Sequence, residues 1–157
     1  MGLSAGQQVN QVFLGGIPDQ SSLVGNLNAI TPLTNEQYNT NAATTATTAT
    51  VSQMAGANDC VLNMTGTLGA GANLTTPTAT ALISALFGPN SPVIGSSWKV
   101  RILNTSGGAF SWTLVGGTGV TVNGTATIAQ NTWREFQVTV SSATTLTMQN
   151  IGGAATV

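Results

Sequence analysis

The stretch that decides the fold runs from residue 97 to residue 151 and reads SWKVRILNTSGGAFSWTLVGGTGVTVNGTATIAQNTWREFQVTVSSATTLTMQNI. Apolar residues recur at every second position in it, as Trp98, Val100 and Ile102 do at its start. This period of two places alternate side chains on the same face of a β-strand. Short polar or glycine-rich turns separate the runs, and Asn123-Gly124 is a strong signal for a two-residue hairpin. The stretch therefore predicts a series of short strands.

Two segments before this stretch, near 43–53 and 60–66, also favour strands, because they are rich in β-branched threonine or in apolar residues. The total is about seven or eight short strands, a pattern typical of a sandwich, a jelly roll or a small barrel. We therefore expect an all-β domain over residues 43–157, with the form of a jelly-roll-like β-sandwich.

One short helix is expected within this β domain, at residues 75–89. Thr76 can cap its first turn, and Pro77 stands where proline is favoured at the start of a helix. Gly88 and Pro89 then end it. The apolar stripe that would face the core follows helical spacing and consists of Ala79, Leu82, Ile83 and Leu86.

Residues 1–42 differ from the rest, because glycine and proline interrupt them repeatedly while short apolar clusters remain. We expect an extended N-terminal arm, which lies either on a neighbouring subunit or across its own domain. Thr34 with Gln37 matches a capping box, and Leu33 with Tyr38 matches a hydrophobic staple, so one or two helical turns are expected there. The residues of the arm expected to contact a partner are Val12, Phe13, Leu14, Ile17, Leu33 and Tyr38.

The charge content is the most informative feature of the composition. Charged residues make up 4% of the chain, and the net charge is −1, whereas about a quarter of the residues of a typical globular protein are charged. A surface of threonine and asparagine can be buried at a contact more easily than a charged surface, provided that it finds hydrogen bonds. The composition therefore favours a protein that is fixed in an assembly. A secreted protein or an adhesin with the same bias is the alternative.

The same composition argues against several kinds of chemistry. The chain has no histidine and one cysteine, Cys60, which removes Ser-His-Asp and Cys-His systems and the usual zinc sites. Three cations cannot form the basic patch that nucleic acid requires. No segment approaches the roughly 18 apolar residues of a membrane span, and no signal peptide is recognised. We expect a protein made in the cytoplasm that is not an enzyme and has no cofactor, metal, nucleic acid or membrane partner.

Four residues of the strand-rich stretch are candidates for contacts with a partner. Lys99 and Arg101 are two positions apart, so they share one strand face, either exposed to solvent or against an acidic surface. Trp133 is out of phase with the apolar positions that follow it, so it lies either in the core or outward at an interface. Arg134 follows directly and is next to Glu135.

Residues 97–152 resemble a β-module of the structural proteins of tailed bacteriophages. The resemblance covers a little over a third of the chain. It depends on three segments, namely Asn104-Thr105-Ser106-Gly107, Gly117-Thr118-Gly119-Val120-Thr121 and Asn131-Thr132-Trp133-Arg134-Glu135-Phe136. The module is found in capsid decoration (cement) proteins and near the ends of head and tail fibres.

The resemblance implies a virion structural protein that binds the outer capsid surface and cements the major capsid subunits. It further implies self-association, with a homotrimer preferred to a homodimer, and the capsid surface of the virion as the location. The short chain fits a decoration protein better than a fibre. A head-fibre, tail-fibre or receptor-binding module that holds sugar on exposed aromatic residues is the alternative.

Overall fold

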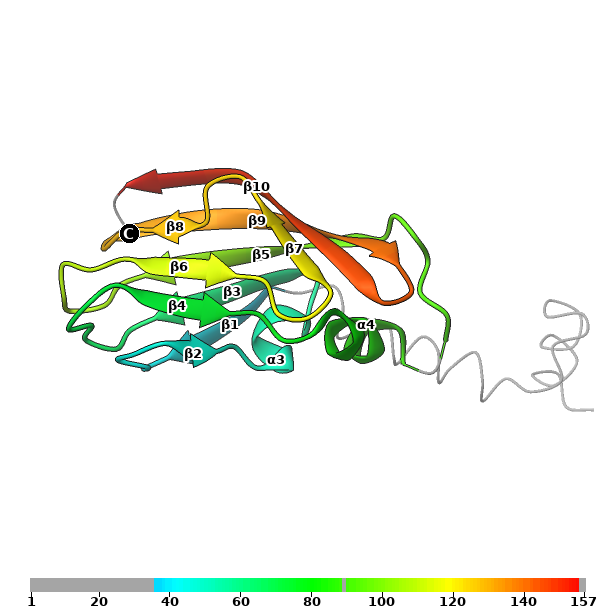
Figure 1. Cartoon of the computed structure of the whole chain (residues 1–157), viewed down its shortest axis with the longest axis horizontal. Coiled ribbons are helices and arrows are strands. Elements are labelled where there is room, and N and C mark those ends of the chain that lie inside the picture. Colours follow the sequence, from blue (N-terminus) through cyan, green and yellow to red (C-terminus); the bar gives the residue numbers. More distant parts are fainter. Residues whose placement is uncertain (1–35, 89, 156–157) are drawn as a thin grey trace, which may run out of the picture. The chain divides into compact units, whose positions relative to one another are not determined.

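The computed structural model of the chain describes residues 36–88 and 90–155, and these form two β-sheets and two helices (Figure 1). The six-stranded sheet has the order β1-β3-β5-β9-β10-β7, and the four-stranded sheet has the order β2-β4-β6-β8. The strands of the first are β1 (Glu36–Asn41), β3 (Asp59–Met64), β5 (Ser97–Asn104), β9 (Thr132–Ser142), β10 (Thr145–Ala155) and β7 (Val120–Asn123). Those of the second are β2 (Thr47–Thr48), β4 (Ala72–Thr75), β6 (Trp112–Val115) and β8 (Thr127–Ile128).

The chain alternates between the two sheets as it winds. β1, β3 and β5 pair in parallel in one sheet, while β2, β4 and β6 pair in parallel in the other. Each turn of this winding, called here a coil, therefore contributes one strand to each sheet and lies beside the preceding coil. Glu36, Asp59 and Lys99 are consequently neighbours on adjacent strands. Helix α3 (Val51–Met54) closes the first coil and helix α4 (Ala79–Phe87) closes the second.

The last part of the chain closes the two sheets with antiparallel strands. β9 pairs with β5 and β10, β8 pairs with β6, and β7 lies parallel to β10 at the far edge. Five of the eight strand pairs are parallel, whereas a jelly roll is built from antiparallel Greek keys. The all-β class and the two sheets agree with the sequence prediction, but the jelly-roll connectivity is not confirmed.

The two sheets pack on each other through one apolar core. Trp112 and Phe136 are fully buried and come from opposite sheets. Helix α3 adds Met54, and helix α4 adds Leu82 and Ile83, which cover one end of this core. Neither helix of the described residues is long and apolar enough to cross a membrane.

Strand β1 is the main departure from the sequence prediction. It lies inside segment 1–42, where an extended arm and a helical turn starting at Thr34 were expected. The sequence of β1 does not alternate between apolar and polar residues, because the positions that face the second sheet are the polar residues Gln37, Asn39 and Asn41. The strand predicted near 43–53 is replaced by the short β2 and helix α3, whose capping box joins Thr50 to Gln53.

The glycine-rich turns have a different role from the one predicted. Asn123-Gly124 does not close a hairpin, since β7 belongs to one sheet and β8 to the other. Ser106-Gly107-Gly108 likewise joins β5 to β6 across the two sheets. In the described residues these turns are corners between sheets, and the only adjacent strands that form a hairpin are β9 and β10.

Helix α4 confirms the predicted helix with shifted ends. Thr78, not Thr76, is its N-cap, and Thr78 Oγ1 accepts a hydrogen bond from the Ala81 amide at 3.3 Å. Thr76 is buried instead, where its hydroxyl accepts from the Gly117 amide at 2.8 Å and donates to the Pro77 carbonyl at 2.9 Å. Gly88 ends the helix with a φ of 58°, a conformation that glycine adopts without strain.

Candidate protein-binding face

The side of the six-stranded sheet that points away from the second sheet, called here the outer face, collects most of the charge. Alternation fixes its members, because Val100, Ile102, Phe136 and Val138 point into the core between the sheets. Five of the six charged residues in the described part of the chain lie on this face. On β1, β3, β5 and β9 the outer face includes Glu36, Tyr38, Thr40, Asp59, Val61, Asn63, Lys99, Arg101, Leu103, Trp133, Glu135 and Gln137.

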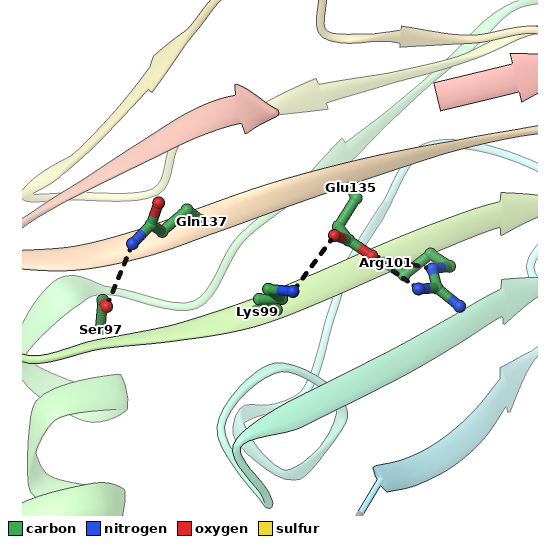
Figure 2. A network of polar contacts seen from close by, with 5 residues as sticks. All are labelled: Ser97, Lys99, Arg101, Glu135 and Gln137. Carbon is green, nitrogen blue, oxygen red and sulfur yellow. Dashed lines mark hydrogen bonds and ion pairs between the residues drawn. The ribbon is translucent and has the colours of Figure 1, made fainter. Parts of the chain in front are cut away.

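Glu135 on β9 joins two cations of β5 at the centre of the outer face (Figure 2). Arg101 donates to Glu135 Oε2 from Nε at 3.0 Å and from Nη2 at 2.7 Å. Lys99 Nζ is 3.7 Å from Glu135 Oε1. The Glu135 side chain is only 15% exposed, whereas those of Lys99 and Arg101 are 53% and 43% exposed. The carboxylate is therefore held in the sheet surface while both cations remain accessible.

Trp133 lies next to this ion cluster. The guanidinium carbon of Arg101 lies 5.2 Å from the centroid of the Trp133 ring, which is a cation–π distance. Leu103 is the register partner of Trp133 and is half-buried beside it. Val61 is also on this face and is 4% exposed, because it lies between Tyr38 and Arg101 in the sheet. Apolar and charged groups are thus packed together on one surface.

Tyr38 at the edge of the sheet is tied to the end of β5 by a chain of hydrogen bonds. Asn63 Nδ2 donates to the Tyr38 hydroxyl at 2.8 Å, and Thr105 Oγ1 donates to Asn63 Oδ1 at 2.7 Å. The Tyr38 residue is nevertheless 56% exposed. An aromatic ring that is held in place and still accessible loses little conformational entropy when a partner covers it.

The structure brings four of the predicted contact residues onto one surface, namely Tyr38, Lys99, Arg101 and Trp133. Arg134 points to the opposite side of β9, where its Nε donates to the carbonyl of Thr127 at 3.3 Å. Val12, Phe13, Leu14, Ile17 and Leu33 lie outside the described residues.

Val61, Asn63 and Leu103 belong to the same surface but were missed by the sequence analysis. Each belongs to a run that reads as an ordinary strand, and only the register of β3 against β1 and β5 shows which neighbours they have. A stretch of the form Cys60-Val61-Leu62 gives no sign of which apolar side chain points outward.

The outward side of the four-stranded sheet has a different character. Thr75, Thr113 and Thr127 are among its residues, together with Asn73 and Val115, and the described strands place no charged side chain there. A shallow groove at the corner of the first two coils is lined by small or uncharged residues from 44–46 and 69–73. The two surfaces of the sandwich therefore differ sharply in charge.

The described residues contain no cluster of three or more histidine, cysteine, aspartate or glutamate side chains that could hold a metal ion. Cys60 is buried, and its thiol donates to the Ala57 carbonyl at 3.5 Å. Burial raises the pKa of this thiol above its ordinary value. It is therefore held as a neutral core group.

Compared with known proteins, the chain matches no family model, no curated protein and no solved structure.

Proposed function

We propose that this protein is a structural subunit of a virus particle, which binds the outer capsid surface and cements the major capsid subunits. The outer face of the six-stranded sheet is the surface that makes this contact. The proposal rests on the resemblance of residues 97–152 to phage decoration proteins and on the low charge content of the chain. The observation that carries it is the group formed by Tyr38, Arg101, Trp133 and Glu135 on one surface.

This group has the physical properties of a contact surface. Tyrosine, tryptophan and arginine are the residues most enriched where protein interfaces gain their affinity. The carboxylate of Glu135 already offsets one of the two positive charges of Lys99 and Arg101. Covering a paired charge costs less free energy than covering an isolated one. The half-exposed Lys99 and Arg101 can still favour a partner surface of opposite charge. We therefore expect the partner surface to be acidic.

The test compares two variants that each add one carboxylate, on opposite surfaces of the sandwich. Gln137→Glu adds it to the outer face next to Lys99, and Thr127→Glu adds it to the outward side of β8. Both positions are exposed, so both variants should fold. We expect Gln137→Glu to weaken binding to particles that lack the protein by about tenfold or more, and Thr127→Glu to change it by less than about twofold.

Equal affinities for the two variants would exclude the outer face as the contact surface. Copy number in purified particles tests the cementing role itself, because a decoration protein is present in hundreds of copies and a fibre in tens. Particles without the protein should also lose heat resistance. Equal resistance with and without it would contradict a cementing role.

A fibre or receptor-binding module is the second candidate, because Tyr38 is 56% exposed and Trp133 is partly exposed on the same face. Sugar rings stack on such aromatic faces. This candidate predicts that the isolated protein binds glycans and that Tyr38→Ala abolishes the binding. A screen in which no glycan binds would exclude it.

A further inference from the structure

Among the described residues, no strand pairs with the outer edge of β1, which presents a defined set of backbone groups. In a strand, the N–H and C=O of one residue point to the same side, and the side alternates along the chain. The Asn41 carbonyl accepts from the Thr65 amide at 2.8 Å, so Gln37, Asn39 and Asn41 direct their backbone groups toward β3. The backbone groups of Glu36, Tyr38 and Thr40 therefore point away from the sheet. Among the described residues, only Gln53 approaches them, with its Nε2 3.3 Å from the Thr40 carbonyl.

The side chains on the inner side of β1 contain a matched pair of unsatisfied groups. Gln37 Oε1 is a buried acceptor and Asn39 Nδ2 is a buried donor, and neither has a hydrogen-bond partner in the described part of the chain. A buried polar group without a hydrogen-bond partner destabilises the fold. In the other two coils the corresponding positions are Cys60 and Leu62, and Val100 and Ile102, which are apolar. The first coil thus ends the stack with amide groups where its neighbours have core residues.

We infer that a second copy of the chain pairs with this edge, β1 against β1 in antiparallel orientation, about a twofold axis at Tyr38. This register places Tyr38 opposite Tyr38 of the second copy, and Glu36 opposite Thr40. These are the residues whose N–H and C=O groups point outward, so the pairs can exchange backbone hydrogen bonds. The carbonyl oxygen of Thr40 has two lone pairs and can keep its contact with Gln53.

The same register brings the side chains of Gln37 and Asn39 together across the twofold axis. Gln37 of one copy lies opposite Asn39 of the other, and the symmetry repeats this pair. Gln37 and Asn39 form a non-hydrogen-bonded pair. In an antiparallel ladder the Cα atoms of such a pair are about 4.5 Å apart, and their side chains lie closer than those of a hydrogen-bonded pair. Gln37 Oε1 and Asn39 Nδ2 are each covered by their own chain, Gln37 Oε1 against Gly56, so both carboxamides must turn toward the partner to form this contact. A parallel pairing, or an antiparallel pairing shifted by one residue, would not pair the outward backbone groups and at the same time place Gln37 opposite Asn39.

The pairing also extends the outer face, because a twofold axis perpendicular to the sheet leaves the outer faces of both copies on the same side. Tyr38 of each copy then lies at the middle of one continuous surface. The twofold symmetry differs from the homotrimer that the sequence resemblance favours. The inference concerns the isolated protein and holds or fails independently of the proposed capsid partner.

Disulfide cross-linking of the full chain tests the register. Tyr38→Cys should form a disulfide-linked dimer by itself in air, because hydrogen-bonded antiparallel pairs have Cα atoms about 5.5 Å apart, within the range of about 4.4–6.8 Å that a disulfide spans. Glu36→Cys and Thr40→Cys should each stay uncross-linked alone and should cross-link when mixed. The parent chain is the control, since Cys60 is buried and should not react.

Sedimentation equilibrium of the reduced protein tests the assembly itself. The 15.8 kDa chain should sediment as a dimer. Tyr38→Pro removes an N–H that the sheet does not use and should give a folded monomer, since proline is tolerated on edge strands. Tyr38→Ala loses the same ring, keeps the N–H and should remain a dimer. A monomeric parent chain would overturn the inference, and so would a trimer or cross-linking of Glu36→Cys to itself.

Discussion

Glu135 shows how a chain with few charges uses them. Its carboxylate accepts two hydrogen bonds from Arg101 and lies 3.7 Å from Lys99 Nζ. A single, partly buried carboxylate therefore fixes two cations that would otherwise move independently on the sheet surface. The arrangement positions Arg101 over the ring of Trp133. Three of the six charged residues in the described part of the chain meet at this point, so removing the carboxylate should have a measurable effect.

We expect Glu135→Gln to lower the free energy of unfolding by about 1 kcal/mol. Charge-assisted hydrogen bonds of partly buried groups are stronger than neutral ones, but exposed cations regain water, which limits the loss. Urea denaturation followed by tryptophan fluorescence measures the change. Glu36→Gln is the matched control, because Glu36 is exposed and forms no ion pair in the described residues. A loss as large in the control would show that the pairing of Glu135 is not the cause.

Cys60 makes stability depend on alkaline pH. Burial raises the pKa of its thiol in the folded chain, so the folded state disfavours the thiolate. The contribution of this neutral thiol is fully present below the pKa of the unfolded chain and is lost as the pH rises through the folded pKa. The parent chain should therefore lose more stability than Cys60→Ala when the pH is raised above the ordinary thiol range. Identical slopes of unfolding free energy against pH for the two proteins would contradict this.

At the scale of elements, local patterns identified the strands but not their partners. The strands over 97–151 were predicted because buried and exposed residues alternate there, for example through Trp98, Val100 and Ile102. Pairing could not be predicted, because Asn123-Gly124 looks the same at a hairpin and at a corner between two sheets. Strand β1 was missed because its inner positions are polar, so the hydrophobic signal for a strand was absent.

The candidate face illustrates the same difference. Lys99 and Arg101 could be placed on one strand face from their spacing, and an outward Trp133 was one of two alternatives that its phase left open. Their convergence with Tyr38 could not be predicted, because it depends on the register of β1, β3, β5 and β9. Residues 38 and 133 are brought onto one surface only by this non-local pairing. Arg134, predicted beside Trp133, is on the other side because alternation separates neighbours.

Helix α4 offers a test of capping within an element. Thr78→Ala removes the acceptor for the Ala81 amide and should lower the free energy of unfolding by about 1 kcal/mol. Ser84→Ala removes an exposed hydroxyl inside the same helix and should be neutral or slightly stabilising, because alanine has the higher helix propensity. Thr80 is less suitable as a control, because its hydroxyl lies 3.2 Å from that of Thr78. Thermal or urea unfolding of both variants measures the difference. If Ser84→Ala costs as much as Thr78→Ala, capping is not the relevant contribution.

At the scale of the whole molecule, the two surfaces of the sandwich are specialised. The outer face holds paired charges and half-exposed aromatic residues, whereas the opposite sheet presents mostly threonine. The stacked coils also leave the six-stranded sheet with two different edges. β1 ends it with unsatisfied amides on its inner side, and β7 ends it with Val120 and Val122 packed against the core. A partner strand therefore gains more at β1 than at β7.

Amide hydrogen exchange, read residue by residue, should distinguish these two edges. In dilute solution Asn39 and Asn41 should exchange slowly, since their amides bond to β3, while Tyr38 and Thr40 exchange quickly. Raising the protein concentration should slow Tyr38 and Thr40, because association protects only the paired edge. Val122 is the control, as its amide points to the free edge of β7: the Leu146 amide donates to the Gly119 carbonyl, which fixes the alternation. If Val122 slows with concentration as much as Tyr38 does, the chains associate without selecting β1, and the match between Gln37 and Asn39 does not direct the assembly.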